Sequence, residues 1–575
     1  MKRRDFLKAA VAAPLVLPHA AFAAAPDAAA LPKFGNARII HLTDTHAQLA
    51  PALYREPSAN IGVGAARGKP PHLVGTAFLD RWKIAPGSRE AYAFACLDFD
   101  ALAKRYGKMG GFDRLATIVK RLRADAPRGD AMLVDGGDLM QGSGLAKLTA
   151  GADMIAAANL LGVEALTGHW EFTYGQDRLR AALKEFKGTF VAQNVFLTED
   201  AAFNGAEAFD QASGRVFPPY VVRSFGDRRV GLIGQAFPYV PVAHPKRFTP
   251  DWTFGLRETE LKALVEVLRT KEKVDAVVLL SHDGMDVDLK LASRVPGLDV
   301  VLGGHTHDAT PAPVAVANSG GTTHVVNGGC NGKFVGSLDL DLAPGKLAGL
   351  RYRLLPVFAD LVAPDAEMAA LVGKLRAPHA ALLDAPLATP GRALWRRGNF
   401  DGPTDDAICV ALLEGLDCQI ALSPGFRWGT TLAAGEPARM EDLLAQTAIT
   451  YGETYATAMT GAQVKSAMED VCDNLFNPDP YYQQGGDMVR AGGFSYSCRP
   501  DAPSGARIGD MTLADGSPLD PAKTYKVAGW ASVSPQGGKD VADLVAAHWA
   551  SAIAKAPPKP VTLLGDDRDP GYIPA

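Results

Sequence analysis

Four short apolar runs in the N-terminal part of the chain are each followed at once by glycine or by side chains that can bind metal. The runs cover residues 38–42, 131–134, 274–280 and 298–302. Short aliphatic runs bounded by glycine and polar residues are typical of buried strands. Between them, the apolar spacing predicts helices over residues 112–124 and 256–270. Strands alternating with helices indicate a layered α/β domain, whose sites form at the carboxyl ends of the strands.

The length of the chain predicts more than one domain. It has 575 residues, and single cores stop growing at about 250–300 residues. We expect a first domain over residues 35–360, a linker helix over 361–385 and a second domain over 386–575, because prolines flank a helix-forming stretch between the two. The elements expected in the second domain are helices over 405–416 and 462–474 and a strand over 525–530.

Two further segments of the first domain stand out. Residues 51–98 form a long insertion that contains proline and glycine, and long loops in compact domains are usually functional or disordered. Residues 220–225 and 228–235 flank the dipeptide Gly226-Asp227. Two strand-like runs around such a dipeptide predict a β-hairpin.

The composition is that of a soluble globular protein, with 47% hydrophobic and 21% charged residues. The net charge of −4 gives no sign of a surface for nucleic acid or membrane. No apolar run after the N-terminus is long enough to span a bilayer. We therefore expect neither nucleic acid nor membrane insertion.

The first 25 residues have the features of an export signal. A basic start is followed by an apolar stretch and then by Ala21-Phe22-Ala23, which fits a cleavage site. Arg3 and Arg4, followed by Asp-Phe-Leu-Lys, resemble the twin-arginine signal. The alternative is an ordinary secretory signal whose two arginines are incidental. Both interpretations predict a periplasmic protein, and the twin-arginine route is favoured.

The six cysteines include no Cys-x-x-Cys pair, so a thiolate zinc site is not expected. An oxidising compartment allows disulfides. Cys472 and Cys498 are a possible pair, because both lie in one region of the second domain. Six buried or free thiols are an equally good interpretation.

Histidines and carboxylates follow the predicted strands in five short motifs. The candidate metal ligands are Asp44, His46, Asp138, His169, His282, His305 and His307. Mixed His/Asp ligands suit Mn, Fe or Zn, whereas calcium prefers oxygen alone. Asp138 can bridge two cations, because the two oxygens of its carboxylate offer separate lone pairs. Two metals about 3.5–4 Å apart activate water for attack on a tetrahedral centre.

The order of these motifs resembles that of the calcineurin-like metallophosphoesterases, and the two-domain layout is similar to that of the periplasmic 5′-nucleotidase family. The resemblance implies a four-layer α/β (α+β) sandwich followed by a 5′-nucleotidase-type α/β domain. It also implies two metal sites that share Asp138. One would use Asp44, His46, Asp138 and His307, and the other Asp138, His169, His282 and His305.

One motif departs from the family pattern. Where the family has Gly-Asn-His-Glu, this chain has Gly168-His169-Trp170-Glu171. His169 replaces an asparagine ligand, and Trp170 replaces the catalytic histidine. Tryptophan cannot act as a general acid, which suits an enzyme whose leaving group is already a good anion. The alternative is an inactive relative, and it is disfavoured because every metal-ligand position still holds a competent ligand. Glu171 is expected to orient the ligands from outside the metal site.

The departing motif, together with GGDLMQGS and GGHTHD, looks like the SoxB family of thiosulfohydrolases (S-sulfosulfanyl-L-cysteine sulfohydrolases). That resemblance implies two manganese ions and the release of sulfate from thiosulfate attached to a cysteine of the carrier protein SoxYZ. Two other hypotheses stay open. One is a 5′-nucleotidase or cyclic-nucleotide phosphodiesterase. The other is a non-catalytic, metal-stabilised binding subunit.

The second domain is expected to supply substrate contacts. By resemblance to the nucleotidases, Arg427 and Phe494 are candidate substrate-binding residues; the alternatives are a surface salt bridge for Arg427 and simple packing for Phe494, since no base need be bound here. Arg397 and Asn399 could line the same cleft, and a purely structural role is at least as good an interpretation for them. A planar guanidinium suits a sulfonate as it does a phosphate. Arg427, Asp138 and Trp170 are the candidate catalytic residues. The side chain of Trp170 would either exclude water from the site or only pack against its neighbours.

Overall fold

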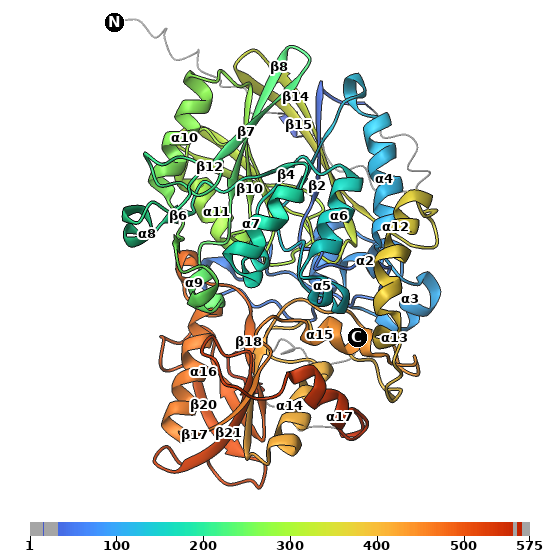
Figure 1. Ribbon diagram of the computed structural model, residues 1–575, viewed down its shortest axis with the longest axis vertical. Coiled ribbons are helices and arrows are strands. Elements are labelled where there is room, and N and C mark those ends of the chain that lie inside the picture. The colour runs from blue at the N-terminus through green and yellow to red at the C-terminus, as the bar shows by residue number, and fades with distance from the viewer. Residues whose placement is uncertain (1–14, 17–32, 556–560, 566–575) are drawn as a thin grey trace, which may run out of the picture.

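Two stacked sheets form the centre of the first domain in this computed structural model (Figure 1), which describes residues 15–16, 33–555 and 561–565. The predicted signal peptide lies outside the described residues except for Leu15–Val16, which form β1. The first sheet has the order β1, β15 (Lys346–Pro356), β14 (Phe334–Ala343), β2 (Ala37–Leu42), β3 (Met132–Asp135), β4 (Ala165–Leu166), β5 (Thr189–Phe190). The second has the order β12 (Val314–Asn318), β13 (Gly321–Asn327), β11 (Val300–Gly303), β10 (Ala276–Ser281), β8 (Arg228–Gln235), β7 (Tyr220–Phe225).

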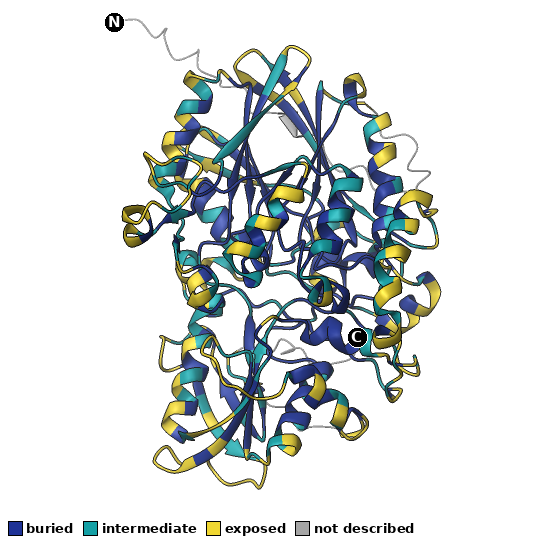
Figure 2. Ribbon diagram, in the orientation of Figure 1, coloured by how far each residue is buried: buried dark blue, intermediate teal, exposed yellow. Residues whose placement is uncertain are grey.

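Alternate residues of the strands face two different cores, as the period of two in a strand requires. Ile39 packs between the sheets, whereas its neighbour Ile40 packs under helices α4 (Phe112–Ala124) and α6 (Ala152–Leu161). In β10, alternate residues divide in the same way between the inter-sheet core and the core under α10 (Glu258–Thr270) and α11 (Met285–Arg294). The result is the predicted four-layer sandwich, with buried strands inside and helices exposed on their outer faces (Figure 2).

The second domain contains a four-stranded and a three-stranded sheet. The larger has the order β17 (Thr454–Thr460), β21 (Thr524–Trp530), β16 (Ile420–Gly425), β18 (Asp487–Gly492). The smaller has the order β20 (Ile508–Leu513), β19 (Phe494–Cys498), β22 (Val561–Leu563). The flanking helices are α14 (Pro403–Leu416), α15 (Met440–Thr447), α16 (Gly461–Phe476) and α17 (Val541–Ala554). The helices and the strand expected in this domain are present within a few residues of their predicted bounds.

The predicted linker helix is interrupted. Helix α12 (Ala366–Arg376) ends before a 3-10 turn (Ala377–His379), and the short α13 (Ala380–Leu383) follows. Pro378 lies in that turn, and proline lacks the N–H that a continuous helix needs. Helix α12 packs against α4 and α6, so it belongs to the outer layer of the first domain.

The insertion is ordered and carries helices α1 (Gly75–Trp82) and α2 (Arg89–Phe94). In the second domain, the sulfur atoms of Cys472 and Cys498 lie 3.7 Å apart as two buried thiols, so their pairing stays a prediction. None of the helices in the described part of the chain has both the length and the hydrophobicity to cross a membrane.

Candidate dinuclear metal site

The candidate ligands lie in the loops that leave five parallel strands. In the first sheet, β2 precedes Asp44 and His46, β3 precedes Asp138, and β4 precedes His169. In the second sheet, β10 precedes His282, and β11 precedes His305 and His307. Five of the seven ligands have left-handed backbone conformations: Asp44 (φ 50°), His46 (45°), Asp138 (56°), His305 (69°) and His307 (60°). Such conformations are uncommon outside glycine and cluster at functional sites.

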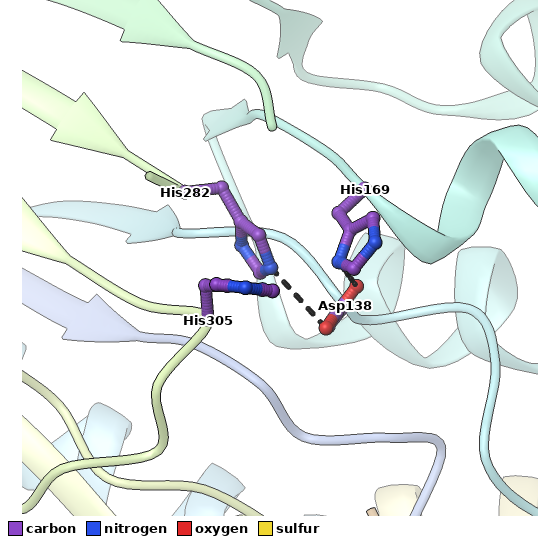
Figure 3. A group of neighbouring side chains, drawn as sticks. All are labelled: Asp138, His169, His282 and His305. Atoms are coloured by element: carbon purple, nitrogen blue, oxygen red, sulfur yellow. Dashed lines mark ion pairs between the residues drawn. The ribbon is translucent and has the colours of Figure 1, made fainter. Parts of the chain in front are cut away.

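The seven side chains converge into two groups that share Asp138. One group contains Asp44, His46, Asp138 and His307, and the other Asp138, His169, His282 and His305. In the second group, Asp138 Oδ2 lies 3.2 Å from His282 Nε2, and Asp138 Oδ1 lies 3.5 Å from His169 Nδ1 (Figure 3). In the first, His46 Nε2 lies 3.0 Å from His307 Nε2 and 3.4 Å from Asp138 Oδ2. The ligand sets derived from the resemblance are thus the sets that the fold brings together.

The hydrogen bonds around the site fit a pair of bound cations. His282 Nδ1 bonds to the carbonyl of Gly136 at 2.6 Å, and His46 Nδ1 to that of Gln141 at 3.1 Å. These bonds leave the Nε2 lone pairs free to bind metal, as is usual for metal-binding histidines. Within the described chain, the buried Nε2 atoms of His282 and His305 have no hydrogen-bond partner. A divalent cation would satisfy them.

The electrostatics of the site favour the same interpretation. Burial lowers the pKa of His46 to about 4 and that of His305 well below its ordinary value, so both rings are neutral. Burial also lowers the pKa of His282, but the carboxylates of Asp138 and Asp44 outweigh it and raise that pKa to about 10. The centre of the site therefore attracts positive charge, whether as a proton or as a metal ion, and metal binding there would release a proton.

Glu171 holds two of the loops in place. Its buried carboxylate accepts hydrogen bonds from the backbone N–H groups of Leu139 and His169, both at 2.7 Å. Asp138 Oδ1 in turn accepts a bond from the Trp170 N–H at 2.8 Å. Glu171 thus positions the two loops that carry Asp138 and His169 without lying in either ligand group, which fits the orienting role expected from the sequence.

A cleft of about 480 Å³ leads to the ligands between the two domains. The first domain contributes His46, Asp138, His169, His305 and His307 to its lining, together with Trp170 and Phe237. The second domain contributes a mostly apolar wall that includes Leu422, Phe426, Trp428, Tyr455, Val489 and Trp530. Arg427 is the one cation among the residues that line this cleft, and its partner Asp487 also lines it.

The predicted second-domain residues have different environments. Arg427 faces the cleft. Arg397 is buried beside His307, where its Nη2 lies 3.4 Å from the carbonyl of Thr306. The side-chain oxygen of Asn399 accepts a hydrogen bond from the backbone N–H of Ile61 at 2.6 Å, so it holds the insertion, although it also borders a small pocket beside the site.

Phe494 does not fit its predicted role as a substrate contact. Its side chain is 2% exposed and packs with Tyr496 in a hydrophobic core of the second domain. It is absent from the residues that line the cleft. The reason is its position at the start of β19, where pairing with β20 directs the ring into that core.

Sequence reasoning missed three features of the site. Asp487 bonds Arg427 Nε at 3.2 Å and Arg490 Nη2 at 3.3 Å. His244 packs against the ring of Trp170, with centroids 4.6 Å apart. A Cβ at Gly485 would lie 2.0 Å from His305 Nε2. The Gly-Gly pair at 485–486 was a detectable signal, whereas nothing in the sequence joins Asp487 to Arg427, 60 positions away.

Fold and site together define a metal-dependent hydrolase of the two-domain metallophosphoesterase class. Residues 37–309 match the calcineurin-like phosphoesterase family, and residues 383–544 match the 5′-nucleotidase C-terminal domain. The solved structure of a sulfate thiohydrolase SoxB from Thermus thermophilus is 33% identical, with a TM-score of 0.87 over 94% of this chain and 99% of that one. The chain belongs to the SoxB family.

Two further relatives are more distant or match over a shorter segment. The 5′-nucleotidase of Rattus norvegicus is 31% identical over 202 residues, which cover 35% of this chain and 33% of the relative. The protein UshA of Yersinia enterocolitica is 23% identical over 72% of this chain and 79% of its own length. The alignment thus spans about one third of the rat enzyme, while the UshA match extends through both domains.

Proposed function

We propose that the chain hydrolyses the thiosulfonate formed when thiosulfate is attached to a cysteine of the carrier SoxYZ, and that it releases sulfate with two manganese ions bound. The observation that carries the proposal is Trp170. It stands where the related phosphoesterases have a catalytic histidine, within a ligand set that is otherwise complete. Membership of the SoxB family supports the same substrate class.

The chemistry of the leaving group explains why tryptophan suffices. Water oxygen attacks the terminal sulfonate sulfur, the bond between that sulfur and the sulfane sulfur breaks, and the carrier keeps a persulfide anion while sulfate and two protons are released. A persulfide leaves as a stable anion at neutral pH, so no general acid is needed, whereas a ribose alkoxide would need one. When bound, the two cations supply an acidified water and polarise the sulfonate oxygens.

Side chains of this protein would supply binding and orientation. The guanidinium of Arg427 faces the cleft and can bond a sulfonate oxygen. Asp487 holds that guanidinium through Nε, which leaves its terminal nitrogens for substrate. Trp170 and Phe426, with ring centroids 5.3 Å apart, form an apolar wall that limits access of bulk water to the ligands.

The test compares two substrates on one preparation. Manganese-loaded protein is incubated with thiosulfate-conjugated SoxYZ and, separately, with AMP, and sulfate and phosphate are measured. We expect sulfate release from the carrier, with no phosphate above the level of an Asp138→Asn control. Phosphate release from AMP alone would establish the nucleotidase alternative. Full metal occupancy with neither product would establish a non-catalytic binding subunit.

We also propose that the protein acts in the periplasm after twin-arginine export. The arginine pair at positions 3 and 4 supports this route. Cell fractionation of the native chain and of the variant with both arginines changed to lysine tests it. We expect the native chain in the periplasm and the variant in the cytoplasm. A variant that is exported normally would indicate the ordinary secretory route.

A further inference from the structure

A segment of the insertion crosses from the first domain to the second and back. We call residues 51–74 the strap. Ile61 and Val63, which are 2% and 8% exposed, pack in a core of the second domain with Phe400, Leu422 and Met488. The strap then returns to the first domain, where His72 Nε2 lies 2.9 Å from Asp286 Oδ2. Two apolar side chains of the first-domain segment are thus part of the core of the other domain.

The start of the strap adds hydrogen bonds to the same connection. The carbonyl of Leu53 accepts a hydrogen bond from the Thr431 N–H at 2.8 Å, and the Arg55 N–H donates to Thr431 Oγ1 at 3.0 Å. The guanidinium of Arg55 lies over the ring of Trp395, 4.1 Å from its centroid. These contacts lie on the side of the cleft where Arg397 and His307 border one small pocket.

Trp170 makes an independent connection on the other side. Its side chain is 6% exposed and belongs to a hydrophobic core that otherwise consists of second-domain residues. Its ring meets Phe426 and Trp428 edge to face, with centroids 5.3 and 6.4 Å apart. Nearby, Thr173 Oγ1 lies 2.7 Å from Thr450 Oγ1, and Tyr451 donates to the carbonyl of Ala243 at 2.7 Å.

We infer that Ile61, Val63 and Trp170 are positioning residues that hold the second domain in one place over the metal ligands. A hinge rotation preserves contacts near its axis and breaks those away from it. Here the strap borders the small pockets beside His305 and His307, whereas Trp170 directly follows His169, so a hinge opening would expose apolar side chains at both places. The substrate therefore reaches the ligands through the preformed cleft, and Arg427 needs no domain closure to reach its working position.

A disulfide lock tests whether the domains must separate. The two threonine hydroxyls that meet across the interface can be replaced in the variant Thr173→Cys/Thr450→Cys, and neither residue lines the cleft. We expect the oxidised variant to keep kcat and KM within about twofold of the reduced, desalted form. Loss of turnover on oxidation, restored by reduction, would overturn the inference. Each single cysteine variant serves as a control.

Restoring activity with the disulfide lock distinguishes a positioning role of Ile61 and Val63 from a role in folding alone. The variant Ile61→Ala/Val63→Ala should lose roughly tenfold in kcat/KM, since small displacements of catalytic groups are costly. The lock should restore most of that loss. A loss that persists in the locked form would contradict the positioning role.

A measurement without turnover keeps this inference separate from the proposed function. Spin labels are attached at cysteines replacing Lys184 on α7 (Gln176–Glu185) and Ser466 on α16, which are exposed and lie in different domains. We expect one narrow distance distribution, with or without manganese. A second, longer distance would overturn the inference, whatever the substrate is.

Discussion

The backbone of the metal ligands is strained, and neighbouring hydrogen bonds hold it. Left-handed conformations at non-glycine residues cost about 1–3 kcal/mol each. The Asp44 N–H donates to the Gly137 carbonyl, and the His46 N–H donates to that of Asp138, both at 2.8 Å. The loops after β2 and β3 therefore support each other. The strained turn brings the side chains of Asp44 and His46 into the same ligand group.

Asp487 is expected to act through Arg427. Replacing it by asparagine removes the anionic partner of Arg427 Nε, so we expect the KM for conjugated carrier to rise roughly tenfold. In a double-mutant cycle with Arg427→Lys, the two effects should be less than additive, because both remove one interaction. Additive losses would show that Asp487 acts independently. The exposed Asp515→Asn variant is the matched control.

Gly485 is expected to be needed for the metal site. An alanine there would place its Cβ 2.0 Å from His305 Nε2, at a φ of +76°. Gly505 has a similar φ of +84°, but a Cβ there would meet nothing within 4 Å. We expect Gly485→Ala to bind less than two metal ions per chain, and Gly505→Ala to cost only about 1 kcal/mol of stability. Elemental analysis and thermal unfolding of both variants provide the comparison.

At the scale of elements, regular hydrophobic periodicity predicted the bounds of helices and strands well, whereas interruptions within an element were not predicted. Helix α4 and the hairpin of β7 and β8 have their predicted bounds. The linker was predicted as one helix because its composition favours helix, yet Pro378 divides it. The insertion was predicted as either functional or disordered. Its apolar residues find partners in two domains, which no local pattern reveals.

Helix α6 carries a buried acid that should make stability depend on pH. Burial raises the pKa of Asp153 to about 6, although its side chain accepts a bond from Thr149 Oγ1 at 2.8 Å. The folded state thus prefers the protonated acid. Its contribution is fully present below the unfolded pKa of about 4 and is lost as pH rises through about 6.

The variant Asp153→Asn tests this dependence. Because asparagine stays neutral, the variant should gain about 1–3 kcal/mol relative to the native chain between pH 5 and pH 8. Denaturant unfolding at both pH values measures the change. Asp177→Asn, an exposed acid in the first turn of α7, should show no such gain. If the free energies of unfolding of Asp153→Asn and the native chain differed by the same amount at both pH values, the prediction would be contradicted.

At the scale of the whole molecule, the reaction site is completed by both domains. The first domain supplies all seven ligands, and the second supplies Arg427 and most of the apolar wall. Neither domain alone has the complete site. Since all seven candidate ligands lie in the first domain, metal removal is expected to affect folding as well as activity.

Metal removal is expected to lower thermal stability. Cations that bind the folded state but not the unfolded state stabilise it by mass action. We expect chelation to lower the Tm by several degrees and added Mn²⁺ to restore it, because the ligands come from loops of both sheets. Scanning calorimetry with parallel elemental analysis measures both. An unchanged Tm after complete metal loss would show that folding does not depend on the site.

The sequence by itself determined the layered α/β first domain and, through its resemblance to the metallophosphoesterases, the class of metal site and the seven candidate ligands. Six of the seven candidate ligands follow one of the four apolar runs, so local periodicity places them at the carboxyl ends of strands, whereas His169 follows the two-residue strand β4. Only the tertiary structure decided that Phe494 is core, that Asp487 holds Arg427, and that Trp170 and the strap join the domains. Those contacts link positions far apart in the chain, and side-chain packing between domains leaves no periodic trace in the sequence.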